Sequence, residues 1–268
     1  MTDRARPAIH PVAWIAWVSA ASLISLSTTD PVYLLLLWAT AWFVYQAQRI
    51  PGPMARSFRM FLAAGVITVV LRTALVLFTP VGSRDVLFAL LEGLRLGTLL
   101  VLFGTFNAVT DPFGLVRLAP KHFHEPALAT ALALSITPRT VASVGKVREA
   151  QRLRGLSTGG LRSLPALVVP VLERGIEEAG TLAESMDARG HGRGPRTRYR
   201  PERWSTASLA VVGAAAVGAA AFVATAVTAR VPLHPATDPL ALSSPDPLLL
   251  GAIALLALPG LMPGGADR

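Results

Sequence analysis

The stretch "FRMFLAAGVITVVLRTALVLFT", Phe58–Thr79, is a long apolar run in which only Arg59 and Arg72 carry charge. Because about 20 predominantly apolar residues in a helix cross the hydrocarbon core of a bilayer, this run predicts a transmembrane helix. The whole chain of 268 residues is 52% hydrophobic and only 15% charged, which is too apolar for an ordinary water-soluble domain. We therefore expect a membrane protein.

Further apolar runs predict an all-α, polytopic membrane protein with five to six transmembrane helices. Four of them are long enough to span or nearly span a bilayer: Val12–Ser27, Pro31–Gln48, Asp85–Val109 and Ser205–Ala229. A shorter final run, Leu248–Leu261, predicts either a sixth span or an interfacial segment. The basic N-terminus is superficially like a signal peptide, but a second apolar run follows at once, so we interpret the first run as a membrane helix.

The segment between the fourth and fifth long runs, Asp111–Arg203, has a different composition. It contains fifteen of the 25 Lys and Arg residues of the chain and nine of its 16 acidic residues. We therefore divide the chain into transmembrane helices 1–4 in residues 1–110, a cytoplasmic domain of amphipathic helices in 111–203, and one or more C-terminal transmembrane helices in 204–268.

The distribution of Arg residues predicts the topology, because cytoplasmic loops of membrane proteins carry an excess of Lys and Arg. Five Arg residues precede the first run or lie between the second run and the start of the third: Arg4, Arg6, Arg49, Arg56 and Arg59. The loops predicted on the other side carry only Arg84 and Arg230. We expect the N-terminus and Asp111–Arg203 to face the cytoplasm, in the plasma membrane of a prokaryote.

Two amphipathic helices are predicted in the cytoplasmic domain, and both end in Arg-Gly. They lie in "TPRTVASVGKVREAQRLRG", with Pro138 expected near the start, and in "RSLPALVVPVLERGIEEAGTLAESMDARG", with Pro170 expected in the first turn or at a kink. Glycine just past a helix end adopts the left-handed conformation cheaply, and Arg in the last turn complements the helix dipole. One interpretation is two capped helices on the membrane surface; the other is that each Arg fork docks in a groove of a partner protein.

The order of these elements resembles that of the transmembrane component of energy-coupling factor transporters. The segment "FGTFNAVTDPFGL" resembles the Thr-rich segment of that family, and "REAQRLRGL" and "LAESMDARGHG" resemble its two signature motifs. The similarity covers about Leu94–Gly192, and the preceding residues match only in hydropathy. One departure lies in the first motif, which reads Leu-Arg-Gly at Leu153–Gly155 where the family commonly has Ala-Arg-Gly.

The resemblance implies a coupling subunit that is not an enzyme and holds no cofactor or metal. In that family the two helices dock on two ABC-type ATPase subunits, and a small membrane protein, the substrate-binding component, binds a vitamin or a transition-metal ion. Carried over by position, ATPase docking is implied for Arg154, Gly155, Ala188, Arg189 and Gly190. Separately from the resemblance, the sequence contains no GxxxxGK[ST] loop, so any ATP hydrolysis is expected from a partner.

Arg72, Glu92 and Arg95 form a candidate intramembrane charge cluster. Glu92 and Arg95 are three residues apart and can pair on one helix face. Charges inside a membrane are candidates for a substrate or proton path, so the alternative function is a self-contained secondary transporter or channel that uses these three residues. We favour a structural role, because all three lie within a few turns of the ends of their helices, where Arg can snorkel.

Two other polar clusters have simpler interpretations than a binding site. His122, His124 and Glu125 lack the i, i+4 spacing of a zinc-binding helix, so we expect an interfacial loop there. The basic run "GRGPRTRYR", which includes Arg193–Arg200, lies before a membrane helix and is more typical of contact with anionic lipid of the bilayer than with nucleic acid.

Overall fold

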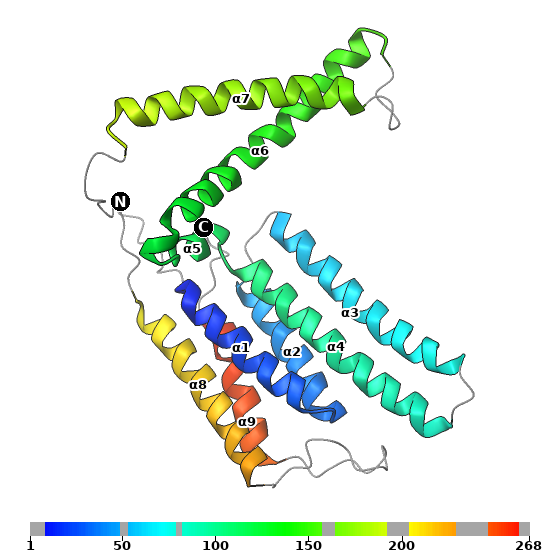
Figure 1. The fold of residues 1–268 in the computed structure, drawn as a ribbon. Coiled ribbons are helices and arrows are strands. Elements are labelled where there is room, and N and C mark those ends of the chain that lie inside the picture. The colour runs from blue at the N-terminus through cyan, green and yellow to red at the C-terminus, as the bar shows by residue number, and fades with distance from the viewer. Residues whose placement is uncertain are drawn as a thin grey trace. The chain divides into compact units, whose positions relative to one another are not determined.

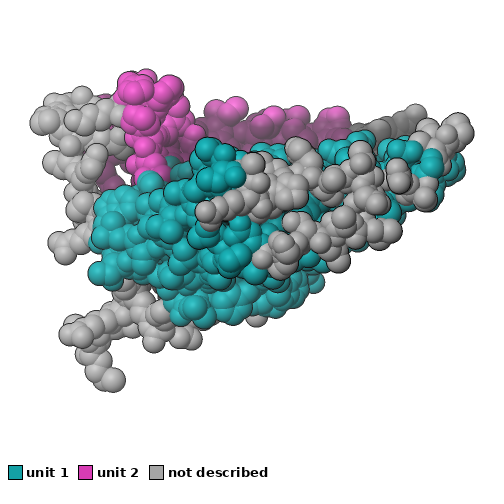
Figure 2. Space-filling view, turned by 90° about the horizontal axis from the view of Figure 1, so that it is seen from below, with its two compact units in different colours: residues 1–115, 202–268 teal, residues 116–201 magenta. Residues whose placement is uncertain are grey.

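The computed structural model describes residues 9–48, 53–78, 82–156, 164–191, 204–228 and 246–262. Within these residues the chain forms ten α-helices, one short 3₁₀ turn and no strand (Figure 1), which confirms the prediction of an all-α fold. The chain divides into two compact units, coloured separately in Figure 2. We call residues 1–115 with 202–268 the bundle, and residues 116–201 the two-helix unit.

Seven described helices lie wholly in the bundle: α1 (Pro11–Ser27), α2 (Pro31–Gln48), α3 (Pro53–Leu77), α4 (Ser83–Val109), α8 (Thr206–Val227), α9 (Pro247–Leu256) and α10 (Leu258–Leu261). The short helix α5 (Pro112–Arg117) contains the boundary between the two units. Its core is apolar and aromatic, with Trp17, Tyr33 and Leu102 almost completely buried. Helix α1 packs on α8 and α4, α2 packs on α4, and α9 packs on α8. Burial of apolar residues on α1, α2, α4, α8 and α9 therefore holds these helices together.

Helices α3 and α4 approach each other along a line of glycines. A Cβ atom placed on Gly97 of α4 would lie 3.0 Å from the carbonyl oxygen of Gly65 in α3, and one placed on Gly104 would lie 2.6 Å from the Cβ of Phe61. Small residues of this kind let the backbones of membrane helices pack closely. The register shows that the two helices are antiparallel. Near its start, α3 also contacts α2, where the ring of Phe58 stacks on that of Tyr45 with 3.7 Å between ring centroids.

The last two helices run along α2 from its beginning to its end. The backbone N–H of Asp246, the cap of α9, donates to the hydroxyl of Tyr33 at 2.9 Å in the first turn of α2. At the other end, the side-chain amide of Gln48 donates to the carbonyls of Pro259 at 2.8 Å and Met262 at 3.0 Å. Helix α9 alone is too short to cross a bilayer, but α9 and α10 together are parallel to α2 and match its length.

Four described helical segments are long and apolar enough to cross a membrane: Ser57–Leu77, Asp85–Val109, His124–Leu153 and Thr206–Val227. Helices α1 and α9 are apolar but shorter. The third segment was not predicted as a span, because it lies in the part of the sequence that we assigned to the cytoplasm.

The two-helix unit contains η1 (Lys121–Phe123), α6 (His124–Leu153) and α7 (Leu164–Ala188). The prediction that Pro138 lies near a helix start is wrong, since α6 begins almost four turns earlier. The prediction of a loop around His124 is also wrong, because α6 begins there. Glu125 and Pro126 are both favoured in the first turn of a helix. Pro170 lies in the second turn of α7 and does not stop it.

Candidate functional site

The first Arg-Gly end is a Schellman motif. Gly155 has a φ of 72°, in the left-handed region that favours glycine. Its N–H donates to the carbonyl of Arg152 at 3.0 Å, and the N–H of Leu156 donates to the carbonyl of Gln151 at 3.0 Å. These two bonds are the pair that defines the motif, with Arg154 as the C-cap residue.

The second Arg-Gly end repeats the same geometry. Gly190 has a φ of 75°, its N–H donates to the carbonyl of Asp187 at 2.8 Å, and the N–H of His191 donates to the carbonyl of Met186 at 3.0 Å. Arg189 therefore holds the position that Arg154 holds at the end of α6, and Ala188 is the last helical residue before it. The similar sequences of the two ends thus fold into matching backbone structures.

Both arginine side chains project away from the helix ends. Arg154 and Arg189 are exposed, and within the described part of the chain neither guanidinium has a recorded hydrogen bond or ion pair. Backbone N–H groups already satisfy three carbonyls in the last turn of each helix, so the guanidinium groups are not needed to cap them. Each planar fork of five donors is free to bind carboxylates or carbonyls of another molecule.

The contact between α6 and α7 separates the two Arg-Gly ends. The side-chain amide of Gln151, near the end of α6, donates to the carbonyl of Ala166, near the start of α7. The first end therefore lies beside the beginning of α7, and the second lies at its far end. At 1.5 Å per residue, this places the two arginines roughly 35 Å apart. One partner groove cannot accommodate both, whereas two partner subunits can.

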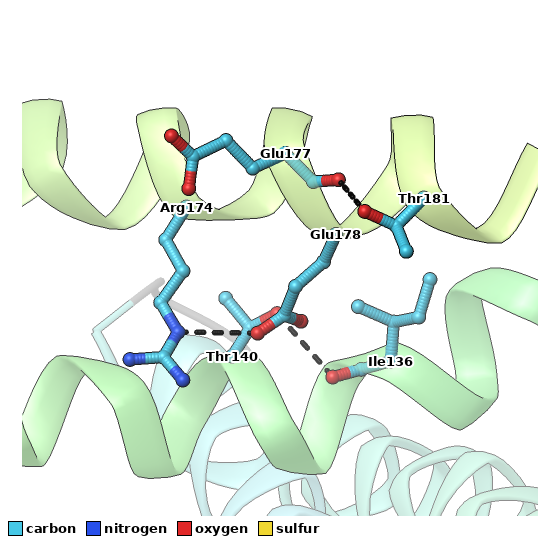
Figure 3. Close-up of polar contacts among 6 residues, drawn as sticks. All are labelled: Ile136, Thr140, Arg174, Glu177, Glu178 and Thr181. Carbon is cyan, nitrogen blue, oxygen red and sulfur yellow. Dashed lines mark hydrogen bonds and ion pairs between the residues drawn. The ribbon is translucent and has the colours of Figure 1, made fainter.

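A shallow groove of about 260 Å³ lies where α6 and α7 cross. Arg174 and Glu178 extend from α7 toward α6 and pair at 3.1 Å, whereas the carboxylate of Glu177 points away (Figure 3). Arg139 and Lys146 of α6 complete a positively charged lining. This exposed ion pair contributes little to stability, since its partners are about half exposed.

The three intramembrane charges are brought together across two helices. Glu92 lies 3.5 Å from a terminal nitrogen of Arg72 on α3 and 3.8 Å from one of Arg95 on its own helix, α4. The side chains of Arg72 and Glu92 are 48% and 41% exposed, and that of Arg95 is 24% exposed. Sequence spacing indicated the pair within α4, but not the contact from α3, which depends on the antiparallel register of the glycines.

The other polar clusters do not form a site in the described structure. Among the described residues there is no group of three or more His, Asp or Glu side chains that could hold a metal ion. His122 packs its ring against Phe123, with 4.6 Å between ring centroids. The basic run Arg193–Arg200 lies outside the described residues, as do Arg4, Arg6, Arg49 and Arg230.

The bundle and the Arg-Gly ends define a helical, multi-pass membrane protein with two exposed arginine forks. Three curated relatives have the name energy-coupling factor transporter transmembrane protein EcfT. The chain is 27% identical to the one from Exiguobacterium sibiricum (66% of this chain, 60% of the relative) and 33% identical to the one from Listeria innocua (39% and 41%). It is 29% identical to the one from Bacillus selenitireducens, over 66% of this chain and 76% of the relative.

The chain is therefore similar to EcfT transmembrane proteins, the likeness that the signature motifs predicted. No family model matches it. The match spans less than two thirds of the length of the first two relatives.

Proposed function

We propose that this chain is the transmembrane coupling subunit of an energy-coupling factor importer for a vitamin or a transition-metal ion. Arg154 and Arg189 dock in grooves of two ABC-type ATPase subunits. Closure of these ATPases on ATP moves α6 and α7, and the bundle carries that movement to a separate, small substrate-binding membrane protein. The chain itself performs no catalysis and needs no cofactor, and it does not bind nucleic acid.

The observation that carries this proposal is the repetition of one helix end at two places roughly 35 Å apart. Capping alone does not account for the arginines, because backbone N–H groups already satisfy three carbonyls in the last turn of each helix. Two exposed forks on separate helix ends fit two copies, or two homologues, of one partner. The names of the relatives support a transporter complex as the setting.

The directions of the helices support a topology in which the bundle crosses the membrane six times, with its first and last helices ending on the same side of the membrane. In such a topology the second and sixth spans run the same way, as α2 and the α9–α10 pair do, and the third and fourth run in opposite ways, as α3 and α4 do. The excess of Arg in the N-terminal segment and in the loop before α3 then assigns that side to the cytoplasm. Residues 111–203 form a cytoplasmic coupling domain in this arrangement.

The charge cluster favours a coupling subunit over a self-contained secondary transporter or channel. Arg72, Glu92 and Arg95 neutralise one another in part, and they lie on the α3–α4 pair. Among the described helices α3 packs along α4, and its contact with α2 lies at Phe58, about 21 Å from Arg72 along the helix. The cluster therefore does not line the interior of the bundle. A transport path through one chain would be expected between several helices.

Co-purification tests the proposal directly. The tagged chain, expressed in its native host and extracted in detergent, is expected to retain two ATPase subunits and one small membrane protein. Recovery of the chain alone, with substrate uptake that continues without ATP, would support the secondary transporter instead.

Topology is tested by labelling single cysteines, because the natural sequence has none. Cysteine in place of Leu156 is expected to react only with reagents that reach the cytoplasm. Cysteine in place of Gly82 is expected to react with impermeant reagents from outside. The opposite pattern would overturn the assignment of sides and the docking of Arg154 with it.

A further inference from the structure

After Glu125 in its first turn, α6 has a segment of twelve residues that carries no charge on any face. The segment "PALATALALSIT", Pro126–Thr137, is followed by Pro138 and then by a strongly basic second half that begins at Arg139. A helix that is apolar all round is normally covered, either by protein or by lipid. Yet no residue of α6 is buried in the described structure. None of the described helices therefore covers this segment.

The hydroxyl groups of the segment need no water. Thr130 donates to the carbonyl of Pro126 at 2.7 Å, and Thr137 donates to that of Ala133 at 2.7 Å. Ser135 donates to the carbonyl of Leu132 at 2.8 Å. Satisfying polar groups within the helix is a condition for placing it in hydrocarbon, where an unpaired group costs several kcal/mol.

The length of the segment fits one leaflet. At 1.5 Å per residue it measures about 18 Å, compared with about 30 Å for the whole hydrocarbon core. Apolar stretches of this length are typical of interfacial or re-entrant segments rather than of complete spans. Although α6 as a whole is long and apolar enough to cross a membrane, its second half contains four cations that oppose a full crossing.

Basic residues border the segment on both sides. In the sequence, Arg117 and Lys121 precede it, and Arg139 and Lys146 follow it. Arg139 and Lys146 line the groove toward α7 and have no recorded ion pair with any described residue. Cations beside an apolar segment are positioned to bind anionic lipid head groups, each worth about 1 kcal/mol near a charged membrane surface.

We propose that Pro126–Thr137 is immersed in the cytoplasmic leaflet and that Arg139 and Lys146 bind anionic phospholipid head groups at its end. Helix α6 is then a rod held in lipid at one end, with Arg154 about 24 Å beyond Pro138 at the other. This anchoring requires no ATPase, and it rests on the proposed function only for the assignment of the segment to the cytoplasmic side. A movement of Arg154 would then tilt α6 about the end that is anchored in the membrane.

Fluorescence of a polarity-sensitive dye tests the immersion. The full chain with a single cysteine in place of Ala129 or Ala133 is labelled with nitrobenzoxadiazole and reconstituted in vesicles of phosphatidylcholine and phosphatidylglycerol. A matched control has cysteine in place of Val141, an exposed residue of the basic half. We expect blue-shifted emission at 129 and 133, and quenching by bromine-labelled acyl chains several-fold stronger than at 141.

Two outcomes would overturn the immersion. Red-shifted, unquenched emission at 129 and 133 would place the segment in water. Blue-shifted emission without bromine quenching would mean that protein covers it. The measurement is made on the chain alone and repeated on the complex with its ATPases, so a failure of the docking proposal does not affect the result.

Head-group binding is tested by removing charge. Lys146→Gln combined with Arg139→Gln is expected to reduce the quenching at 133 by at least about twofold, and replacement of phosphatidylglycerol by phosphatidylcholine should have the same effect on the natural chain. Arg148→Gln, which removes a cation from α6 outside the groove lining, serves as the control and should have little effect. Equal quenching in all variants and in both lipids would overturn the head-group contact.

Discussion

The bundle and the two-helix unit are both helical, but the bundle buries side chains between its helices and the two-helix unit leaves its side chains accessible. In the bundle, polar side chains connect helices far apart in the sequence: the indole N–H of Trp17 donates to the carbonyl of Leu256 at 2.7 Å, and the hydroxyl of Thr105 donates to that of Ala41 at 3.2 Å. In the two-helix unit, neither α6 nor α7 has a buried residue.

This difference shows where the chain specifies its own structure and where it leaves surfaces for other molecules. Substitutions inside the bundle should change stability first, because they alter packing between its own helices. Substitutions at the Arg-Gly ends should change association with partners and leave the bundle intact. Four predictions test this division, in order of decreasing expected effect.

The largest effect is expected for the Arg-Gly ends. Removing a charged, multiply hydrogen-bonded group from an interface typically costs 2–5 kcal/mol, and each 1.4 kcal/mol is a tenfold loss of affinity. Arg154→Ala or Arg189→Ala should each weaken capture of the ATPases, and the double variant should abolish ATP-dependent uptake in vesicles. Lys should rescue poorly at either position, because a point charge does not reproduce the planar fork.

The control for this experiment is Arg148→Ala, which removes an exposed arginine from α6 but not from its end. It should retain wild-type capture and uptake. All variants should insert in the membrane and melt at the same temperature as the natural chain. If the double Arg-to-Ala variant captured the ATPases normally, the two arginines would be no more than surface charges. The view that the two-helix unit binds partners through them would then be wrong.

A smaller effect, on stability alone, is expected for Gly97→Ala in the bundle. The new methyl group would lie 3.0 Å from the carbonyl oxygen of Gly65, which is backbone and cannot turn aside. Overpacking of this kind costs about 1–3 kcal/mol. Thermal unfolding in detergent should show a lower melting temperature.

Its matched control is Gly180→Ala in α7, where a Cβ atom meets nothing within 4 Å. Alanine in a helix interior is favoured over glycine by about 1 kcal/mol, so this variant should be neutral or slightly stabilising. A similar loss of stability in both variants would contradict the view that only the bundle is closely packed.

The sequence alone predicted much of this contrast, because its signals are local. Helical type follows from the long apolar runs, and the two Schellman motifs follow from glycine directly after an arginine at a helix end. The start of α6 was missed because Pro126–Thr137 has no polar face and hence no periodicity to read, which made Pro138 the first visible start signal. The contact of Arg72 with Glu92 was missed because it depends on the register of two helices.

A still smaller effect is expected at the glycines of the two Arg-Gly ends. In Gly155→Ala or Gly190→Ala the new side chain must take a left-handed backbone conformation, which costs roughly 1–2 kcal/mol. The residues after each helix end can unwind into solvent to relieve this strain, so the melting temperature of the bundle should stay constant. The arginine at that end would then lose its fixed position, and the affinity for the ATPases should fall by about tenfold. Titration of purified ATPases against the reconstituted chain measures the affinity. A lower melting temperature with unchanged affinity would place these glycines with the bundle instead.

The smallest effect is expected for the charge cluster on α3 and α4. Its side chains are partly exposed and its distances are 3.5 and 3.8 Å, so the pairing should contribute only about 0.2–1 kcal/mol to stability. Glu92→Gln should therefore lower the melting temperature slightly and leave ATP-dependent uptake nearly unchanged. The charge swap Arg72→Glu with Glu92→Arg should destabilise less than the sum of its two single changes, because the pair is restored, although Arg95 then faces a like charge at position 92.

A proton or substrate path would behave differently: Glu92→Gln would remove the titratable group and abolish uptake while the chain still bound its ATPases. Uptake measured beside ATPase capture for the same variant thus separates a structural cluster, which the geometry favours, from a transport path through a single chain.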